Sequence, residues 1–110
     1  MKELLENVEE FLNAGEDNMK KGRFNAAASD FFKSIVIMCD YLIYREIKIL
    51  PKNHTERFSL LKSYFNDIYR KVSELFSTYT ESYNKKLSKE DALKIGNYAN
   101  EIRNNILNKK

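Results

Sequence analysis

Hydrophobic residues between Gly22 and Pro51 recur at every third or fourth position, a spacing that predicts one long helix from about Phe24 to Lys48. One stripe of this helix carries Ala27, Ala28, Phe31, Ile35, Met38 and Leu42. In its second half the opposite side is apolar too, with Phe32, Val36, Cys39 and Ile43. A helix that is hydrophobic all round has to be covered by neighbouring elements. We therefore expect this segment to be the central helix of a bundle, enclosed by the other helices.

The segment before it has the same periodicity and predicts a first helix from about Lys2 to Lys21. Gly15 lies on the apolar stripe of this helix, where a glycine lowers helix propensity by about 1 kcal/mol. The usual compensation is the close approach of a neighbouring helix. Gly22 can adopt the left-handed conformation that commonly ends a helix. The first two helices should therefore form a tight antiparallel hairpin.

A break is expected at Pro51, because proline disfavours helix in the residue before it. Asn53 and Glu56 then have the spacing of a capping box, in which two side chains satisfy the free amides of a helix start. A third helix should therefore begin near His54.

Two further helices complete the predicted chain. The fourth should follow a brief interruption at Asn66-Asp67 and end near Tyr79. Residues 80–87 are polar and unpatterned, which indicates a loop. Ser88 followed by Asp91 is typical of a helix start and predicts that the final helix begins there.

The length and composition of the chain fit one small helical domain. With 110 residues, of which 43% are hydrophobic, the chain can bury roughly two thirds of the surface that its unfolded form exposes. No segment combines alternating polarity with β-branched residues and turn dipeptides, so strands are not expected. We predict an all-α domain over residues 1–110, an up-and-down bundle of four to five helices with a long central second helix.

The charge of the chain is mild, because 19 basic residues face 16 acidic ones and the net charge is +3. A protein with an extended nucleic-acid-binding surface would have a larger excess of basic over acidic residues. A single cysteine, Cys39, cannot form an internal disulfide, which indicates a reducing compartment. The N-terminus lacks the features of a secretory signal, and the longest apolar run, residues 35–39, is far shorter than the about 18 residues that a membrane span requires. We expect a soluble, cytoplasmic protein.

No catalytic constellation is recognisable among the titratable residues. His54 is the only histidine, and eight residues with a proline turn separate it from Arg45. A surface or helix-start role is favoured for His54, and a catalytic pair of Arg45 with His54 is the alternative. No metal-ligand spacing occurs, so neither a metal nor another cofactor is expected. Asp40 needs a partner on the central helix, for which Tyr44 or a basic residue of a neighbouring helix is the candidate.

One cluster before the final helix could contact a phosphate or stack on a base, and it consists of Tyr83, Asn84, Lys85, Lys86 and Lys89. A solvated loop explains the same residues. A second basic cluster lies at the tip of the first hairpin and consists of Lys20, Lys21 and Arg23. The sequence does not settle whether the two clusters share a face.

The opening hairpin carries the residues Gly22, Phe24, Ala27, Phe31 and Ser34. Their order and spacing resemble the tetratricopeptide repeat. Such a repeat closes its second helix with a proline, whereas Cys39 occupies that place here, and no second copy appears at a ~34-residue period. A tetratricopeptide-like peptide binder therefore requires that the second helix end near Cys39.

Three motifs follow one another along most of the chain: Gly22-Arg23-Phe24-Asn25-Ala26-Ala27, Leu50-Pro51-Lys52-Asn53-His54 and Leu87-Ser88-Lys89-Glu90-Asp91-Ala92. In order and spacing they resemble the HEPN domain superfamily of small prokaryotic helical bundles. The resemblance implies an up-and-down bundle that is usually a homodimer and is often paired with a minimal nucleotidyltransferase. Some members of the superfamily are metal-independent ribonucleases.

The ribonuclease branch of that superfamily uses an arginine and a histidine a few residues apart near the start of the last long helix. Between Ser77 and Asp91 this chain has neither residue. Of the related Ala-Asp-Tyr signature only Tyr83 is kept. Ribonuclease activity by the family mechanism is therefore not expected.

Two functions from different classes follow from these observations. The favoured one is a non-enzymatic HEPN-like module that forms a homodimer and binds a protein partner, such as a minimal nucleotidyltransferase in a toxin–antitoxin-like pair. The physical motive is the excess of apolar and aromatic surface on the second and fourth helices. The alternative is a nucleotide- or RNA-binding protein, in which Tyr83, Lys85 and Lys86 contact the phosphate or base. Arg45 or His54 would then aid any cleavage.

Overall fold

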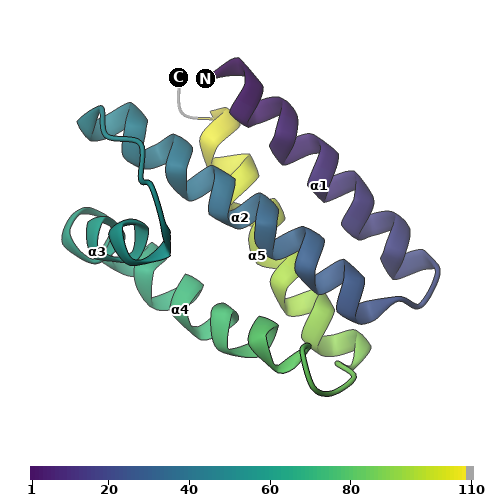
Figure 1. Ribbon diagram of the computed structural model, residues 1–110. Coiled ribbons are helices and arrows are strands. Elements are labelled where there is room, and N and C mark those ends of the chain that lie inside the picture. The colour runs from purple at the N-terminus through teal and green to yellow at the C-terminus, as the bar shows by residue number, and fades with distance from the viewer. Residues whose placement is uncertain (109–110) are drawn as a thin grey trace.

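Five helices joined by short connections make up the computed structural model, which describes residues 1–108 (Figure 1). They are α1 (Lys2–Lys20), α2 (Phe24–Ile47), α3 (His54–Tyr64), α4 (Asn66–Glu81) and α5 (Lys89–Asn108). The predicted all-α bundle is confirmed, and residues 1–108 contain no strand. Over the same residues, none of the helices has the length and apolar character needed to cross a membrane.

α1 and α2 form the antiparallel hairpin that the sequence predicts, and Figure 1 shows them side by side with α5 behind α2. The chain reverses at Gly22, which adopts a φ of 72° in the left-handed region. The amide of Arg23 then donates to the carbonyl of Asn18 at 2.9 Å. α2 continues without interruption to Ile47. The tetratricopeptide-like interpretation, which requires this helix to end near Cys39, is therefore wrong.

The predicted capping box starts α3. Asn53 Oδ1 accepts a hydrogen bond from the amide of Glu56 at 2.9 Å, and Glu56 Oε1 accepts one from the amide of Lys52 at 3.1 Å. Figure 1 shows α3 nearly end-on, so it runs across the other helices. The helix ends where Phe65 takes a φ of −139° and a ψ of 61°. An interruption between the third and fourth helices is therefore confirmed, but it lies at Phe65 and not at Asn66-Asp67, which are the first two residues of α4.

α4 is longer than the sequence indicates. It continues to Glu81, so the predicted loop starting at Thr80 is wrong by two residues and the connection to α5 begins at Ser82. The start of α5 agrees with the prediction: Ser88 Oγ accepts from the amide of Asp91 at 3.1 Å, and the Asp91 carboxylate accepts from the amide of Ser88 at 3.3 Å.

An aromatic ring of α2 fills the centre of the core between two glycines. Phe31 is 3% exposed, and its ring lies against Gly15 of α1 and Gly96 of α5. A Cβ atom built on Gly15 would lie 2.5 Å from the nearest ring carbon, and one built on Gly96 would lie 2.8 Å from it. The close approach predicted at Gly15 is therefore confirmed, and its cause is the ring of Phe31.

The central position of α2 is confirmed, but its complete enclosure is not. α2 contacts all four other helices, and Ile35, Cys39 and Ile43 are fully buried. Val36 and Ile37 are only partly buried, however, and both line a groove whose other lining residues come from α1, α3 and α4 as well as α2. One face of the central helix is thus open.

Candidate functional site

The open flank of α2 forms the floor of a groove between α1 and the α3–α4 pair, with a cavity volume of about 360 Å³. We call it the α2 groove, and its lining consists of Phe11, Phe32, Lys33, Val36, Ile37, His54, Arg57 and Tyr79. Val36 and Ile37 form the apolar floor, while Phe11 stands on the α1 side and Tyr79 on the α4 side. No acidic residue is among the lining residues.

A chain of three polar side chains crosses the α3 side of the α2 groove. The guanidinium of Arg57 donates to both carboxylate oxygens of Asp40, at 2.6 Å and 2.9 Å, and its Nη1 lies 2.9 Å from Nδ1 of His54. Because an arginine can only donate, His54 Nδ1 is the acceptor and the ring proton lies on Nε2. The side chains of Arg57 and Asp40 are 11% and 13% exposed, so the ion pair is largely buried.

This arrangement corrects the sequence analysis in one respect and confirms it in another. Asp40 does pair with a basic residue of a neighbouring helix, as expected, and that residue is Arg57. His54 has an arginine partner, but the partner is Arg57 and not Arg45. The i, i+3 spacing of His54 and Arg57 on one helix is the signal that could have found it. Arg57 therefore holds a buried carboxylate, and its donors to Asp40 and His54 are already occupied.

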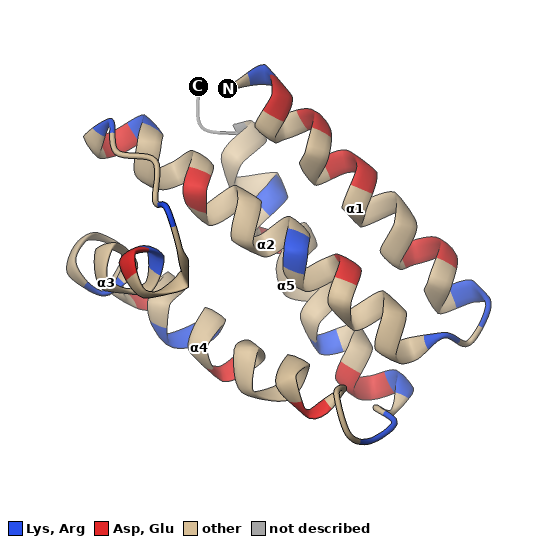
Figure 2. Ribbon diagram, viewed as in Figure 1, with Lys and Arg blue, Asp and Glu red and all other residues tan. Residues whose placement is uncertain are grey.

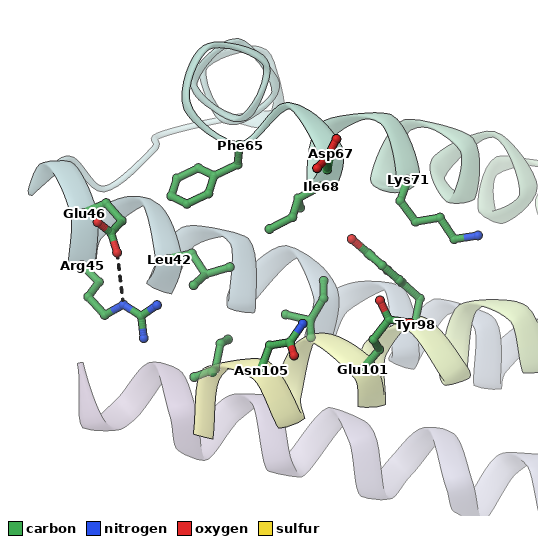
Figure 3. A pocket seen from close by; sticks show the side chains of 12 residues that line it. Leu42, Arg45, Glu46, Phe65, Asp67, Ile68, Lys71, Tyr98, Glu101 and Asn105 are labelled. Carbon is green, nitrogen blue, oxygen red and sulfur yellow. Dashed lines mark ion pairs between the residues drawn. The ribbon is translucent and has the colours of Figure 1, made fainter. Parts of the chain in front are cut away.

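Arg45 lies in a different cavity, between α2, α4 and α5 (Figure 3). Its Nε is 3.7 Å from a carboxylate oxygen of Glu46, and its guanidinium lies over the ring of Tyr41, 5.6 Å from the centroid. His54 does not line this cavity. The structure therefore does not bring the candidate pair of Arg45 and His54 into one site.

Aromatic rings form the α4 wall of the α2 groove. Phe32 and Tyr79 stack with centroids 4.9 Å apart and an interplanar angle of 5°. The hydroxyls of Tyr79 and Tyr83 lie 3.0 Å apart. This hydrogen bond is the main cause that raises the pKa of Tyr79, and burial is the next. Tyr83 is 75% exposed and extends the wall toward the solvent. The raised pKa keeps the Tyr79 hydroxyl protonated at neutral pH.

The predicted phosphate-binding cluster is divided in the structure. Lys85 Nζ forms an ion pair with Glu81 at 3.2 Å, Tyr83 pairs with Tyr79, and Lys89 is the first residue of α5. Asn84 lies in the turn between α4 and α5, and its backbone amide donates to the carbonyl of Glu81.

Lys86 lies apart from the rest of this cluster. Together with Arg23 it lines a cleft of about 400 Å³ at the start of α2. One member of each basic cluster therefore does share a face. Lys21 of the hairpin tip is less available, since it forms an ion pair with Asp17 at 2.9 Å.

Asn25, which the sequence shows only as one member of the Gly22–Ala27 motif, holds this end of the molecule together. Its side-chain amide donates to the carbonyls of Ser82 and Lys85, at 3.1 Å and 2.9 Å. Its side-chain oxygen accepts from the amide of Leu87 at 2.8 Å. One side chain of α2 thus fixes the connection between α4 and α5, and with it the position of Lys86.

Comparison with known proteins gives no relative: no family model, no curated protein and no solved structure matches the chain. Within residues 1–108, no three His, Cys, Asp or Glu side chains lie close enough together to hold a metal ion. Cys39 is fully buried, and burial raises the pKa of its thiol to about 12, which leaves it a poor nucleophile at neutral pH.

Proposed function

We propose that this protein is a HEPN-like, non-catalytic interaction module that forms a homodimer through the α2 groove and binds a protein partner. The observation that carries the proposal is the open apolar flank of the central helix. Val36 and Ile37 lie at the floor of the α2 groove, and the stripe continues along α2 with the partly buried Tyr41 and Tyr44. An apolar strip of this kind on a helix that is otherwise buried is typical of a surface that a further element covers.

The polar residues of the α2 groove are compatible with being covered. Asp40 compensates the charge of Arg57, and Nδ1 of His54 accepts a hydrogen bond from Arg57. The ammonium of Lys33 lies over the ring of Phe11, 5.4 Å from its centroid, so its stem follows apolar surface. Among the lining residues, only Lys33 would then bring a charge without an acidic partner into the covered surface.

Charge complementarity supports a second copy of this chain as the occupant. α1 carries six acidic and two basic residues, a net charge of −4, whereas residues 48–89 on the other side of the groove carry nine basic and four acidic residues, a net charge of +5. Figure 2 shows the acidic residues distributed along α1. A two-fold axis parallel to α2 would place the acidic side of each copy opposite the basic side of the other.

The HEPN resemblance supports the same assignment, since members of that superfamily are usually homodimers and are often paired with a minimal nucleotidyltransferase. A partner of that class would bind the dimer as a toxin–antitoxin-like pair. The Arg–His motif of the ribonuclease branch has no counterpart between Ser77 and Asp91, which favours binding over catalysis.

Sedimentation of the purified protein tests the homodimer. We expect a dimer at micromolar concentration, and we expect Ile37→Glu to give a folded monomer because it places a carboxylate on the floor of the α2 groove. Leu93→Glu is the matched control, since Leu93 is 39% exposed on α5, outside the groove, and this variant should remain dimeric. A wild-type protein that sediments only as a monomer, or an Ile37→Glu variant that stays dimeric, contradicts the proposal.

The second candidate function, nucleotide or RNA binding, is favoured by one observation, the shared cleft of Arg23 and Lys86 at the start of α2. Titration of ATP and of labelled RNA at low ionic strength tests it. Binding should weaken steeply with salt and should be lost in Arg23→Glu/Lys86→Glu, while Lys94→Glu on the exposed face of α5 should leave it unchanged. No binding at tens of micromolar would exclude this function.

A further inference from the structure

The imidazole of His54 is held at the edge of the α2 groove by a positive charge. Its Nδ1 lies 2.9 Å from Nη1 of Arg57 and accepts a hydrogen bond, because an arginine can only donate. The ring is exposed, and the ring centroids of Phe58 and Phe76 lie 6.0 Å and 6.1 Å from its own. A proton on Nδ1 would remove the acceptor and place two positive charges side by side. Protonation therefore releases the ring from Arg57.

The acidic residues on this side of the groove already accept hydrogen bonds. On α3, Glu56 takes part in the capping box, and the positive end of the helix dipole lies at His54, the first residue of the helix. On α2, both carboxylate oxygens of Asp40 accept from Arg57, and Lys33 adds another positive charge to the groove. The charges of α2 and α3 therefore give a protonated His54 little compensation.

The other two helices of the groove add no acidic residue to its lining. α4 contributes Tyr79, whose raised pKa keeps the hydroxyl protonated at neutral pH, and α1 contributes Phe11. A positive charge on His54 is therefore compensated best by a carboxylate from outside its own copy.

The proposed homodimer supplies such a carboxylate, and the inference rests on that dimer. A two-fold axis parallel to α2 places α1 of the second copy, with its net charge of −4, opposite the α3 side of the groove. Phe11 of the second copy then lies against His54. Glu10 precedes Phe11, is exposed, and has no ion-pair partner within residues 1–108. It is the carboxylate best placed to meet the ring.

We propose that His54 makes the homodimer sensitive to pH, because its protonated ring leaves Arg57 and pairs with Glu10 of the second copy. Histidine ordinarily changes its charge between about pH 5 and 8, whereas carboxylates stay ionised over most of that range. The dimer binds the proton more tightly than the separate copies do. Falling pH therefore tightens the dimer, and rising pH loosens it. Two such pairs form in each dimer, because the interface is symmetric.

Sedimentation equilibrium at about pH 8 and about pH 6 tests the proposal, and the dissociation constant of the dimer should be about fivefold smaller at the lower pH. His54 is the only histidine, so the imidazole signals in nuclear magnetic resonance spectra belong to it. They should shift over the pH range in which the dissociation constant changes. A dissociation constant that is unchanged or larger at the lower pH would overturn the inference and leave the dimer intact. A protein that is monomeric at both pH values would contradict the dimer as well.

Three variants identify the two groups of the pair. His54→Gln keeps an acceptor for Arg57 but has no ring to protonate, so its dissociation constant should be the same at both pH values. Glu10→Gln removes the carboxylate and should also abolish the tightening. Glu16→Gln is the matched control and should keep it, since Glu16 lies toward α5, where its charge acts on Arg103. Tightening that persists in His54→Gln or in Glu10→Gln would contradict the proposed pair.

Discussion

The contact of Phe31 with Gly15 and Gly96 predicts the effect of adding a single methyl group. In Gly15→Ala the new Cβ would lie 2.5 Å from Cε1 of the Phe31 ring, whereas ordinary contacts lie between 3.4 and 4 Å. The ring cannot retreat toward α5, because its other edge is already so close to Gly96 that a Cβ there would lie at 2.8 Å. The ring must therefore leave its rotamer or push the helices apart.

The magnitude follows from two opposing effects. Overpacking a closed core costs about 1 to 3 kcal/mol, and a ring held from both sides belongs at the upper end. Replacing a helical glycine by alanine contributes about 1 kcal/mol in the other direction. We expect Gly15→Ala to lower the free energy of unfolding by about 2 kcal/mol, the difference between these two effects.

Urea denaturation followed by far-UV circular dichroism, at one fixed protein concentration, measures this free energy. Asn13→Ala on the exposed face of α1 is the control and should be neutral or slightly stabilising. In a Phe31→Leu background the cost of Gly15→Ala should shrink, which a double-mutant cycle detects. A Gly15→Ala variant as stable as the natural protein would refute the argument that the ring is held between the two helices.

Three further predictions concern stability. Arg57→Met should lower the free energy of unfolding by about 3 kcal/mol, because it leaves the largely buried Asp40 carboxylate unpaired, and Asp40→Leu/Arg57→Met should recover most of it in the same denaturation assay. Asn25→Ala removes three hydrogen bonds and should cost about 2 kcal/mol, with faster amide hydrogen exchange at Leu87. The pKa of Cys39 rises from 9.0 to about 12 on folding, so the folded state binds its proton more tightly and stability should fall between those two pH values. Cys39→Ala should reduce that slope by up to about 1.4 kcal/mol per pH unit, as urea titrations at pH values across that window would measure.

The helices could be predicted because their limits are set by nearby residues. Gly22 ends α1 through its own φ, and Asn53 starts α3 by binding an amide three residues away. The end of α4 was missed because Thr80 and Glu81 carry no hydrophobic pattern, although they still form helical hydrogen bonds. The close approach at Gly15 could be expected, but the second glycine, Gly96, depends on where α5 lies.

The candidate sites were harder to predict because they depend on contacts between distant residues. Arg57 reaches Asp40 across 17 positions, and Asn25 bonds to residues 57 to 62 positions later. Charge pattern alone placed Lys85 and Lys86 in one cluster, whereas the structure pairs the first with Glu81 and turns the second toward Arg23.

The central claim is that a second copy of this chain covers the open flank of α2. Isotope-filtered nuclear Overhauser spectroscopy on a mixture of ¹³C-labelled and unlabelled protein tests it most directly. We predict contacts between the Ile37 methyl groups of one copy and the α2 groove of the other, and contacts between Phe11 of one copy and His54 of the other, as an axis parallel to α2 requires. A dimer whose intermolecular contacts lie elsewhere, or a sample with none, would contradict the account.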